Sequence, residues 1–340
     1  MIEGVLWAIF AGLMLGLYAL PEKFTKGFKY ENTWSLFFLL TMFVVPSIVS
    51  VVLINGFGDI FGNMPTDIWI KMGLASFLWG IGVMMWSKAI NYIGLSLGFS
   101  IFIGTVILVG SLLPFIVDGI PPANVLLFIA IGILIVLLGI VLNGKAGLIR
   151  EKDEKKSDRE QEVDTSKGSM ATGILIAVIG GLLATGFSYA NAVGRPYLHQ
   201  ASVAQGNPDW ITAVAIMFPI FISGGIVMTA YFLWQLNKKN AWGHFKISSF
   251  SKNLFLILIM AVFHYAASAL FAYAASKLGA SGNTVGYAIF NTASVATAII
   301  SGIVTHEWVR ASSKARKILY AGLGCMVLGI LVIAYGNGQM

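Results

Sequence analysis

One histidine stands in an apolar stretch of the sequence that contains no carboxylate. His264 opens the segment "HYAASALFAYAAS", residues 264–276. An imidazole has a reference pKa of about 6.5 and can exchange a proton near neutral pH. Ionisable groups inside long apolar segments are functional by default, and a neutral, hydrogen-bonded structural histidine is the alternative. His264 is therefore our first candidate for proton exchange. Glu22, in "LPEKF" at the end of the first apolar segment, is the second.

A stripe of polar side chains forms the second constellation. Tyr287, Asn291 and Ser294 are spaced i, i+4 and i+7, which places them on one face of a helix. An amide in hydrocarbon without a partner costs several kcal/mol, so we expect a neighbouring helix or a bound ligand to satisfy Asn291. Tyr189 and Asn191 in "FSYANAVG" follow the same logic.

Two tryptophans, Trp79 and Trp86, are separated by seven residues and share a helix face with Gly82. Tryptophans of membrane proteins usually lie at the membrane interface, and six others are expected there: Trp34, Trp69, Trp210, Trp234, Trp242 and Trp308. Trp79 is too central for such a position, because its apolar segment begins near Ile68. It either lines a cavity or packs between helices, and Trp86 has the same two alternatives.

Hydrolytic chemistry has one weak signal. "GLSLG", residues 94–98, matches the Gly-x-Ser-x-Gly elbow of serine hydrolases, and His264 would supply the base of an intramembrane hydrolase. That elbow needs a strand-to-helix turn, whereas this stretch opens a helix. The single cysteine, Cys325, excludes an internal disulfide, and the sequence contains neither a phosphate-binding loop nor a metal-ligand cluster. We therefore expect that the protein is not an enzyme and that it binds neither a cofactor nor a metal ion.

The elements that position these residues follow from hydropathy. The chain of 340 residues is 57% hydrophobic and 11% charged, with a mean hydropathy of +0.83. A transmembrane helix needs about 20 apolar residues, and ten intervals that lack Asp, Glu, Lys and Arg meet this need, the third with the help of its flanks. They are 4–21, 32–58, 72–87, 89–117, 119–144, 168–194, 210–237, 253–276, 278–306 and 318–340. The fold class is an all-α integral membrane protein with ten transmembrane helices.

The loop charges predict the orientation. Loops after the odd-numbered spans hold nineteen Lys and Arg residues, against three (Lys71, Arg195 and Lys277) on the opposite side. The positive-inside rule then places both termini outside the cytoplasm. "MIEGVLWAIF" lacks a basic region, so we interpret it as a retained first span and not as a signal peptide. The basic residues behind the net charge of +7 lie in these loops. We expect them to contact anionic lipid head groups and not nucleic acid. Lys88 and Lys277 are expected to reach the interface with their long side chains.

The chain divides into two similar halves. Residues 145–167, "KAGLIREKDEKKSDREQEVDTSK", form a charged cytoplasmic linker between a first five-helix repeat, 1–144, and a second, 168–340. At an offset of 185 residues, Ala89, Gly94 and Ser96 recur as Ala274, Gly279 and Ser281. Because five is odd, the second repeat enters the membrane from the opposite side. We therefore expect inverted repeats, an architecture in which one half can move against the other around a central site.

Several phrases resemble a known family. They are "WGIG" at 79–82, "YIGLSLGFSIFIGTVILVGSL" at 92–112, "ATGFSYANAVGRP" at 184–196, "EW" at 307–308 and "LGC" at 323–325. With the ten spans, they resemble the L-rhamnose–proton symporter family of the drug/metabolite transporter superfamily. The resemblance implies a bacterial inner-membrane transporter that takes up L-rhamnose or a related deoxyhexose or hexose with a proton by alternating access. The alternative is an exporter of amino acids or other small metabolites from the same superfamily. Coupling to Na⁺, or no coupling, stays open.

The resemblance gives the candidate residues their expected roles. A monosaccharide presents hydroxyl groups and apolar ring faces, so its site needs amide or hydroxyl partners and an aromatic plate. The substrate candidates are Trp79, Trp86, Tyr189, Asn191, Tyr287, Asn291 and Ser294. The coupling candidates are His264 and Glu22. The expected partners are a small neutral sugar, a proton and membrane lipid, and the oligomeric state is open.

Overall fold

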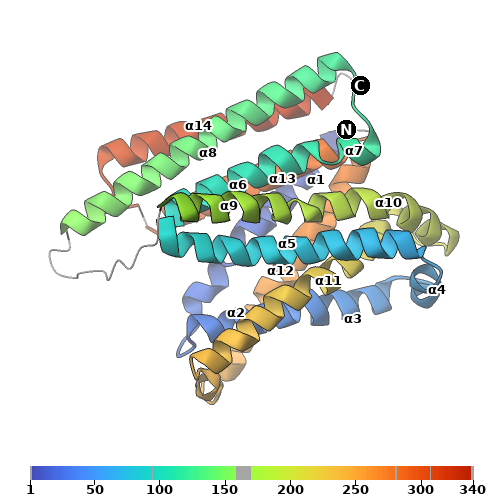
Figure 1. Cartoon of the computed structure of the whole chain (residues 1–340), viewed down its shortest axis with the longest axis horizontal. Coiled ribbons are helices and arrows are strands. Elements are labelled where there is room, and N and C mark those ends of the chain that lie inside the picture. Colours follow the sequence, from blue (N-terminus) through green and yellow to red (C-terminus); the bar gives the residue numbers. More distant parts are fainter. Residues whose placement is uncertain (1, 94, 158–169, 280–281, 307, 338–340) are drawn as a thin grey trace.

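A computed structural model describes residues 2–93, 95–157, 170–279, 282–306 and 308–337. These residues are almost entirely helical and include no strand (Figure 1). Ten of the helices are long and apolar enough to span a membrane, which confirms the predicted fold class. Gly94, the linker residues 158–167, Ser281 and Glu307 lie outside the described residues.

The chain up to Ser157 contains ten elements, nine of which build the first five spans. Span one contains α1 (Ile2–Leu17) and the short 3₁₀ helix η1 (Leu20–Phe24). Span two contains α2 (Tyr30–Leu39), η2 (Leu40–Val44) and α3 (Val45–Leu53), and the short α4 (Phe57–Gly62) follows it. The remaining elements are α5 (Thr66–Ile93), α6 (Leu95–Leu112) with α7 (Phe115–Asp118), and α8 (Ala123–Ser157).

The last five spans have more regular helices. Span six is divided into α9 (Met170–Ala184) and α10 (Gly186–Ala204). Span seven is α11 (Asp209–Lys238), followed by the 3₁₀ helix η3 (Trp242–Phe245). Spans eight to ten are α12 (Phe250–Lys277), α13 (Gly282–Val304) and α14 (Ser313–Asn337).

Spans two and six are irregular near the middle of the bundle. In η2 the backbone makes a π-helical turn, so that the N–H of Val45 donates to the carbonyl of Leu40, five residues back. Pro46 follows and has no N–H to donate to the preceding turn. In span six the helix breaks at Thr185, whose hydroxyl donates to the carbonyl of Leu182 at 2.6 Å. Both irregularities lie beside the cavity described below.

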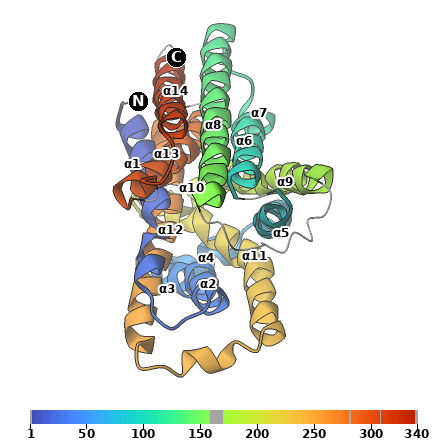
Figure 2. The same ribbon diagram turned by 90° about the vertical axis from the view of Figure 1, so that its left-hand side faces the viewer.

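Glycines set the closest helix contacts. A Cβ at Gly186 would lie 2.0 Å from the carbonyl oxygen of Ala75, so α10 approaches α5 as closely as it does only because this residue is glycine. The antiparallel pair α8 and α14 is joined in the same way, through Gly132 against Gly329 and Gly139 against Gly322. These two helices lie side by side at one edge of the molecule (Figures 1 and 2).

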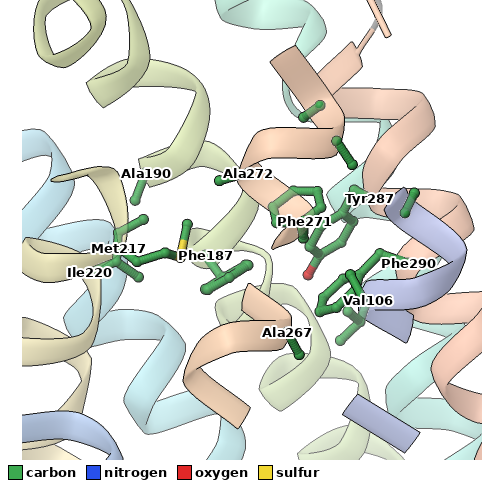
Figure 3. Close-up of a cluster of buried hydrophobic side chains, with 14 of the residues drawn as sticks. Val106, Phe187, Ala190, Met217, Ile220, Ala267, Phe271, Ala272, Tyr287 and Phe290 are labelled. Carbon is green, nitrogen blue, oxygen red and sulfur yellow. The ribbon is translucent and has the colours of Figure 1, made fainter. Parts of the chain in front are cut away.

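The core of the bundle lies where α10, α11, α12 and α13 meet α6 (Figure 3). Phe271 is fully buried and stacks on Phe290, with 5.0 Å between the ring centroids. It also meets the ring of Tyr287 edge-on at 5.6 Å. Of the ten spans, α11 and α13 have the largest buried share. Because α13 is enclosed, the polar stripe on this helix faces protein and not lipid.

Candidate functional site

A cavity of about 350 Å³ lies inside the bundle. Its walls come from most of the spans: α1, α2, η2, α5, α6, α9, α10, α11, α12 and α13. No described residue of α8 or α14 lines it. Aromatic rings form much of the wall: Tyr18, Tyr30, Trp34, Phe37, Phe38, Trp79, Trp86, Phe99, Phe102, Phe187, Phe232, Tyr287 and Phe290. None of the described lining residues carries a carboxylate, an ammonium or a guanidinium group.

The polar stripe of α13 reaches this cavity. Tyr287, Asn291 and Ser294 all line it, as the helical spacing predicts for residues on one face. The Asn291 amide donates to the carbonyl of Tyr287 at 2.9 Å, and the Ser294 hydroxyl donates to the carbonyl of Asn291 at 2.9 Å. Both hydrogen bonds stay within α13. The amide donor of Asn291 is therefore satisfied by its own helix and not by a neighbouring one.

Trp79 and Trp86 both line the cavity from α5. Trp79 packs against Phe187, with 5.1 Å between ring centroids, and against Phe221 at 5.8 Å. Trp86 stacks on Phe102 at 5.8 Å. The indole N–H of Trp86 is buried and has no hydrogen-bond partner among the described residues. A buried N–H without a partner is unfavourable and is rare in folded proteins.

His264 lines the cavity from α12. Its Nδ1 lies 3.1 Å from the hydroxyl oxygen of Thr41 in the π-helical turn η2. Three rings surround the imidazole, with centroid distances of 5.1 Å to Tyr18 and 5.5 Å to both Phe37 and Phe221. His264 is the one titratable residue other than tyrosine among the described lining residues. The sequence singled out this histidine, but not the threonine that contacts it.

Glu22 contacts the cavity wall through its neighbour Trp34. It is not among the described lining residues, and its carboxylate accepts a hydrogen bond of 2.8 Å from the indole of Trp34. Trp34 lines the cavity, which the sequence alone did not predict. The missed signal is an aromatic stripe in α2, in which Tyr30, Trp34 and Phe37 follow one another at helical spacing and all face the cavity.

Tyr189 and Asn191 lie on α10, outside the described lining of the cavity. Tyr189 packs against the apolar core. Asn191 is fully buried, and its amide donates to Asn283 of α13 at 2.7 Å. Asn283 in turn donates to the carboxylate of Asp118 in α7 at 2.6 Å. This chain of three side chains joins α10, α13 and α7 near the end of the bundle where both chain termini lie (Figure 1).

None of the described charged residues is part of the cavity lining. Lys88 is exposed at the end of α5. Lys277 lies 3.8 Å from Asp209 and over the ring of Tyr273. Among the described residues, no group of three or more His, Cys, Asp and Glu side chains is placed to hold a metal ion. The cavity is therefore suited to a neutral ligand that presents hydroxyl groups and apolar faces.

Comparison with known proteins agrees with this chemistry. The sequence model of the L-rhamnose-proton symport protein family (RhaT) matches residues 1–339. The L-rhamnose-proton symporter of Escherichia coli O1:K1 / APEC is 22% identical over 347 residues, which cover 99% of this chain and 97% of that protein. The L-rhamnose-proton symporter of Shigella boydii serotype 18 is 23% identical with the same coverage. The chain thus belongs to the L-rhamnose-proton symport protein family.

Proposed function

We propose that the chain takes up L-rhamnose, or a related deoxyhexose or hexose, together with a proton by alternating access. The observation that supports this function most directly is the cavity. Its described lining carries no charged side chain, is rich in aromatic rings and includes one histidine. Membership of a family of symport proteins supports the same function. The chain is then a multi-pass protein of the bacterial inner membrane and not an enzyme.

The chemistry of the wall favours a sugar over the alternative cargo. An amino acid carries an ammonium and a carboxylate, and a site for it needs groups of opposite charge or helix ends to replace their hydration. The described wall offers rings, hydroxyls, one amide, one imidazole and the helix break at Thr185, but no charged side chain. A sugar needs this combination, since its hydroxyls pair with polar groups while its apolar faces lie on rings. An exporter of amino acids is therefore the weaker candidate.

We assign the substrate contacts to α5 and α13. In this assignment Trp79 and Trp86 supply flat apolar surfaces, and the unpartnered indole N–H of Trp86 donates to a sugar hydroxyl. Asn291, Ser294 and Tyr287 supply polar groups along the facing stripe. We do not include Tyr189 and Asn191 among these contacts, because they lie outside the described lining.

The proposed coupling residue is His264. With no carboxylate among the described lining residues, the imidazole is the group best suited to bind a proton next to the sugar. A symporter requires that sugar and proton favour each other's binding. Glu22 is the second candidate, since it contacts the wall residue Trp34. A carrier that uses Na⁺ or no coupling ion is the remaining alternative.

The proposed architecture is a pair of inverted repeats separated by the linker 145–167, as in the drug/metabolite transporter superfamily. Spans one and six occupy matching places in the repeats, and both are interrupted: α1 is followed by the 3₁₀ helix η1, and span six breaks at Thr185. Spans five and ten, which also match, pair through glycines. The charge distribution supports an orientation with both termini outside and the linker in the cytoplasm.

Counterflow in proteoliposomes tests the substrate. Vesicles loaded with unlabelled sugar should accumulate labelled L-rhamnose transiently, whereas vesicles loaded with amino acids should not. Exchange of an amino acid without exchange of any sugar would overturn the assignment of the substrate. A membrane potential of about 100 mV gives about 2.3 kcal/mol per proton, or roughly 50-fold accumulation for one proton per sugar. His264→Gln should keep counterflow and lose this accumulation, because glutamine forms hydrogen bonds but does not titrate near neutral pH.

A further inference from the structure

We infer that Thr41 is a positioning residue for proton coupling: its hydroxyl holds the Nδ1–H of His264, so that Nε2 is the nitrogen that takes up the transported proton. The inference rests on the proposed function of proton-coupled sugar uptake. It adds a residue from span two, and it specifies which atom of the imidazole reacts.

The geometry around Thr41 includes two contacts of the same hydroxyl. Its oxygen lies 3.1 Å from Nδ1 of His264 and 3.2 Å from the carbonyl oxygen of Ala261, one turn earlier in α12. Thr41 itself is fully buried. Its hydroxyl group is therefore enclosed between a backbone carbonyl and the imidazole of one helix. Because Thr41 is buried, water does not replace either of these partners.

The number of protons decides the tautomer. A hydroxyl has one proton to donate, and a carbonyl oxygen can only accept. Both contacts are hydrogen bonds in one arrangement alone: Thr41 donates to Ala261 and accepts from Nδ1–H of His264. The neutral imidazole then carries its proton on Nδ1, which leaves the lone pair of Nε2 free. A proton that binds to Nε2 leaves the Nδ1–H bond to Thr41 in place.

With Nδ1 held by Thr41, Nε2 is the ring nitrogen left to bind a proton from the cavity that His264 lines. His264 lines the cavity, and Tyr18, Phe37 and Phe221 confine its ring without forming a hydrogen bond to it. The other titratable groups near this part of the cavity come from four neighbouring segments: Tyr18 in the turn after α1, Glu22 of η1, Tyr30 of α2 and Tyr287 of α13. The tyrosines are neutral near pH 7, and Glu22 is engaged by Trp34. From α11 the facing residue is the apolar Phe221.

The π-helical turn η2 makes the contact between Thr41 and His264 sensitive to a change in backbone conformation. Thr41 lies inside η2, where the hydrogen bond from Val45 to Leu40 spans five residues instead of four. Such turns are rare and are frequent at functional sites. A return of this segment to regular α-helical geometry would rotate Thr41 relative to α12, and this would release Nδ1. The contact therefore connects the protonation state of His264 to the backbone of span two.

Two substitutions separate this role from packing. Thr41→Val keeps the shape of the side chain and removes the hydroxyl, whereas Thr41→Ser keeps the hydroxyl. We expect Thr41→Val to retain L-rhamnose counterflow, which shows that the variant is folded, and to shift the pH profile of uphill accumulation. The shift should be toward lower pH by up to about one unit, as for the loss of one hydrogen bond. Thr41→Ser should restore the wild-type profile.

Nuclear magnetic resonance of ¹⁵N-histidine-labelled protein gives a readout that does not depend on transport. The His264 signals are those absent from His264→Gln, and we expect the wild type to show Nδ1 protonated and Nε2 unprotonated at high pH. A wild-type protein with Nε2–H at high pH would overturn the inference, and so would an unshifted pH profile in Thr41→Val. Failure of the proposed function is distinguishable, because the wild type itself would then lack uphill accumulation of L-rhamnose.

Discussion

Replacing Trp86 by phenylalanine should weaken sugar binding without weakening the fold. The indole N–H is buried without a partner among the described residues, so the empty protein already bears the cost of removing this donor from water. A sugar hydroxyl that accepts from it relieves that cost. The relief is worth about 1–3 kcal/mol for a buried donor, and Trp86→Phe should therefore raise the Kd for L-rhamnose roughly 5- to 150-fold. Phenylalanine keeps an aromatic ring to stack on Phe102.

The assay pairs equilibrium binding of labelled L-rhamnose with thermal unfolding of the same sample. Trp69→Phe is the matched control, because the indole of Trp69 donates to the carbonyl of Phe61 at 3.3 Å, away from the cavity. We expect the control to lower the unfolding temperature and leave Kd unchanged, whereas Trp86→Phe leaves the unfolding temperature unchanged or raises it. An unaltered Kd in Trp86→Phe would refute the reasoning, since the N–H would then have no role in the bound state.

Three further predictions concern folding and orientation. Gly186→Ala should destabilise the protein by about 1–3 kcal/mol, because its Cβ meets backbone; Gly324→Ala, which meets nothing within 4 Å, is the control in thermal unfolding. Asn283→Ala should cost about 1–3 kcal/mol by leaving Asn191 and Asp118 without their shared partner; an unchanged unfolding temperature would contradict this role. Tags at both termini should report the outside and tags within 145–167 the cytoplasm, and a cytoplasmic C-terminus would contradict the charge rule.

The ten spans could be predicted from the sequence because hydrocarbon demands a minimum apolar length. Even the third span, whose charge-free interval is 72–87, was recoverable: the helix runs from Thr66 to Ile93 and holds Lys88 at its exposed end. The helix period likewise placed Tyr287, Asn291 and Ser294 on one face. These inferences need only local geometry, which the order of residues carries directly.

Other parts of the site depend on neighbours that the sequence does not name. Asn191 was recognisable as a polar residue in an apolar helix, but its partner Asn283 lies 92 positions away and on another helix. Pro46 indicates that the helix is irregular near the π-helical turn at Leu40–Val44. It does not predict the helical register that brings Thr41 to His264. Trp34 was expected at the membrane interface, and its place in the cavity wall depends on tertiary packing that the sequence does not name.

The pairing of α8 with α14 offers an experimental handle. The cavity wall receives no described residue from either helix, and α8 continues without a break to Ser157. In Figure 1 this end of α8 extends past the neighbouring helices. A rigid helical domain fused in register to α8 would add a recognisable mass outside the lipid for electron microscopy. Particle alignment would then rely on a feature that shares no surface with the ligand, so binding measurements on the fusion would apply to the unmodified protein.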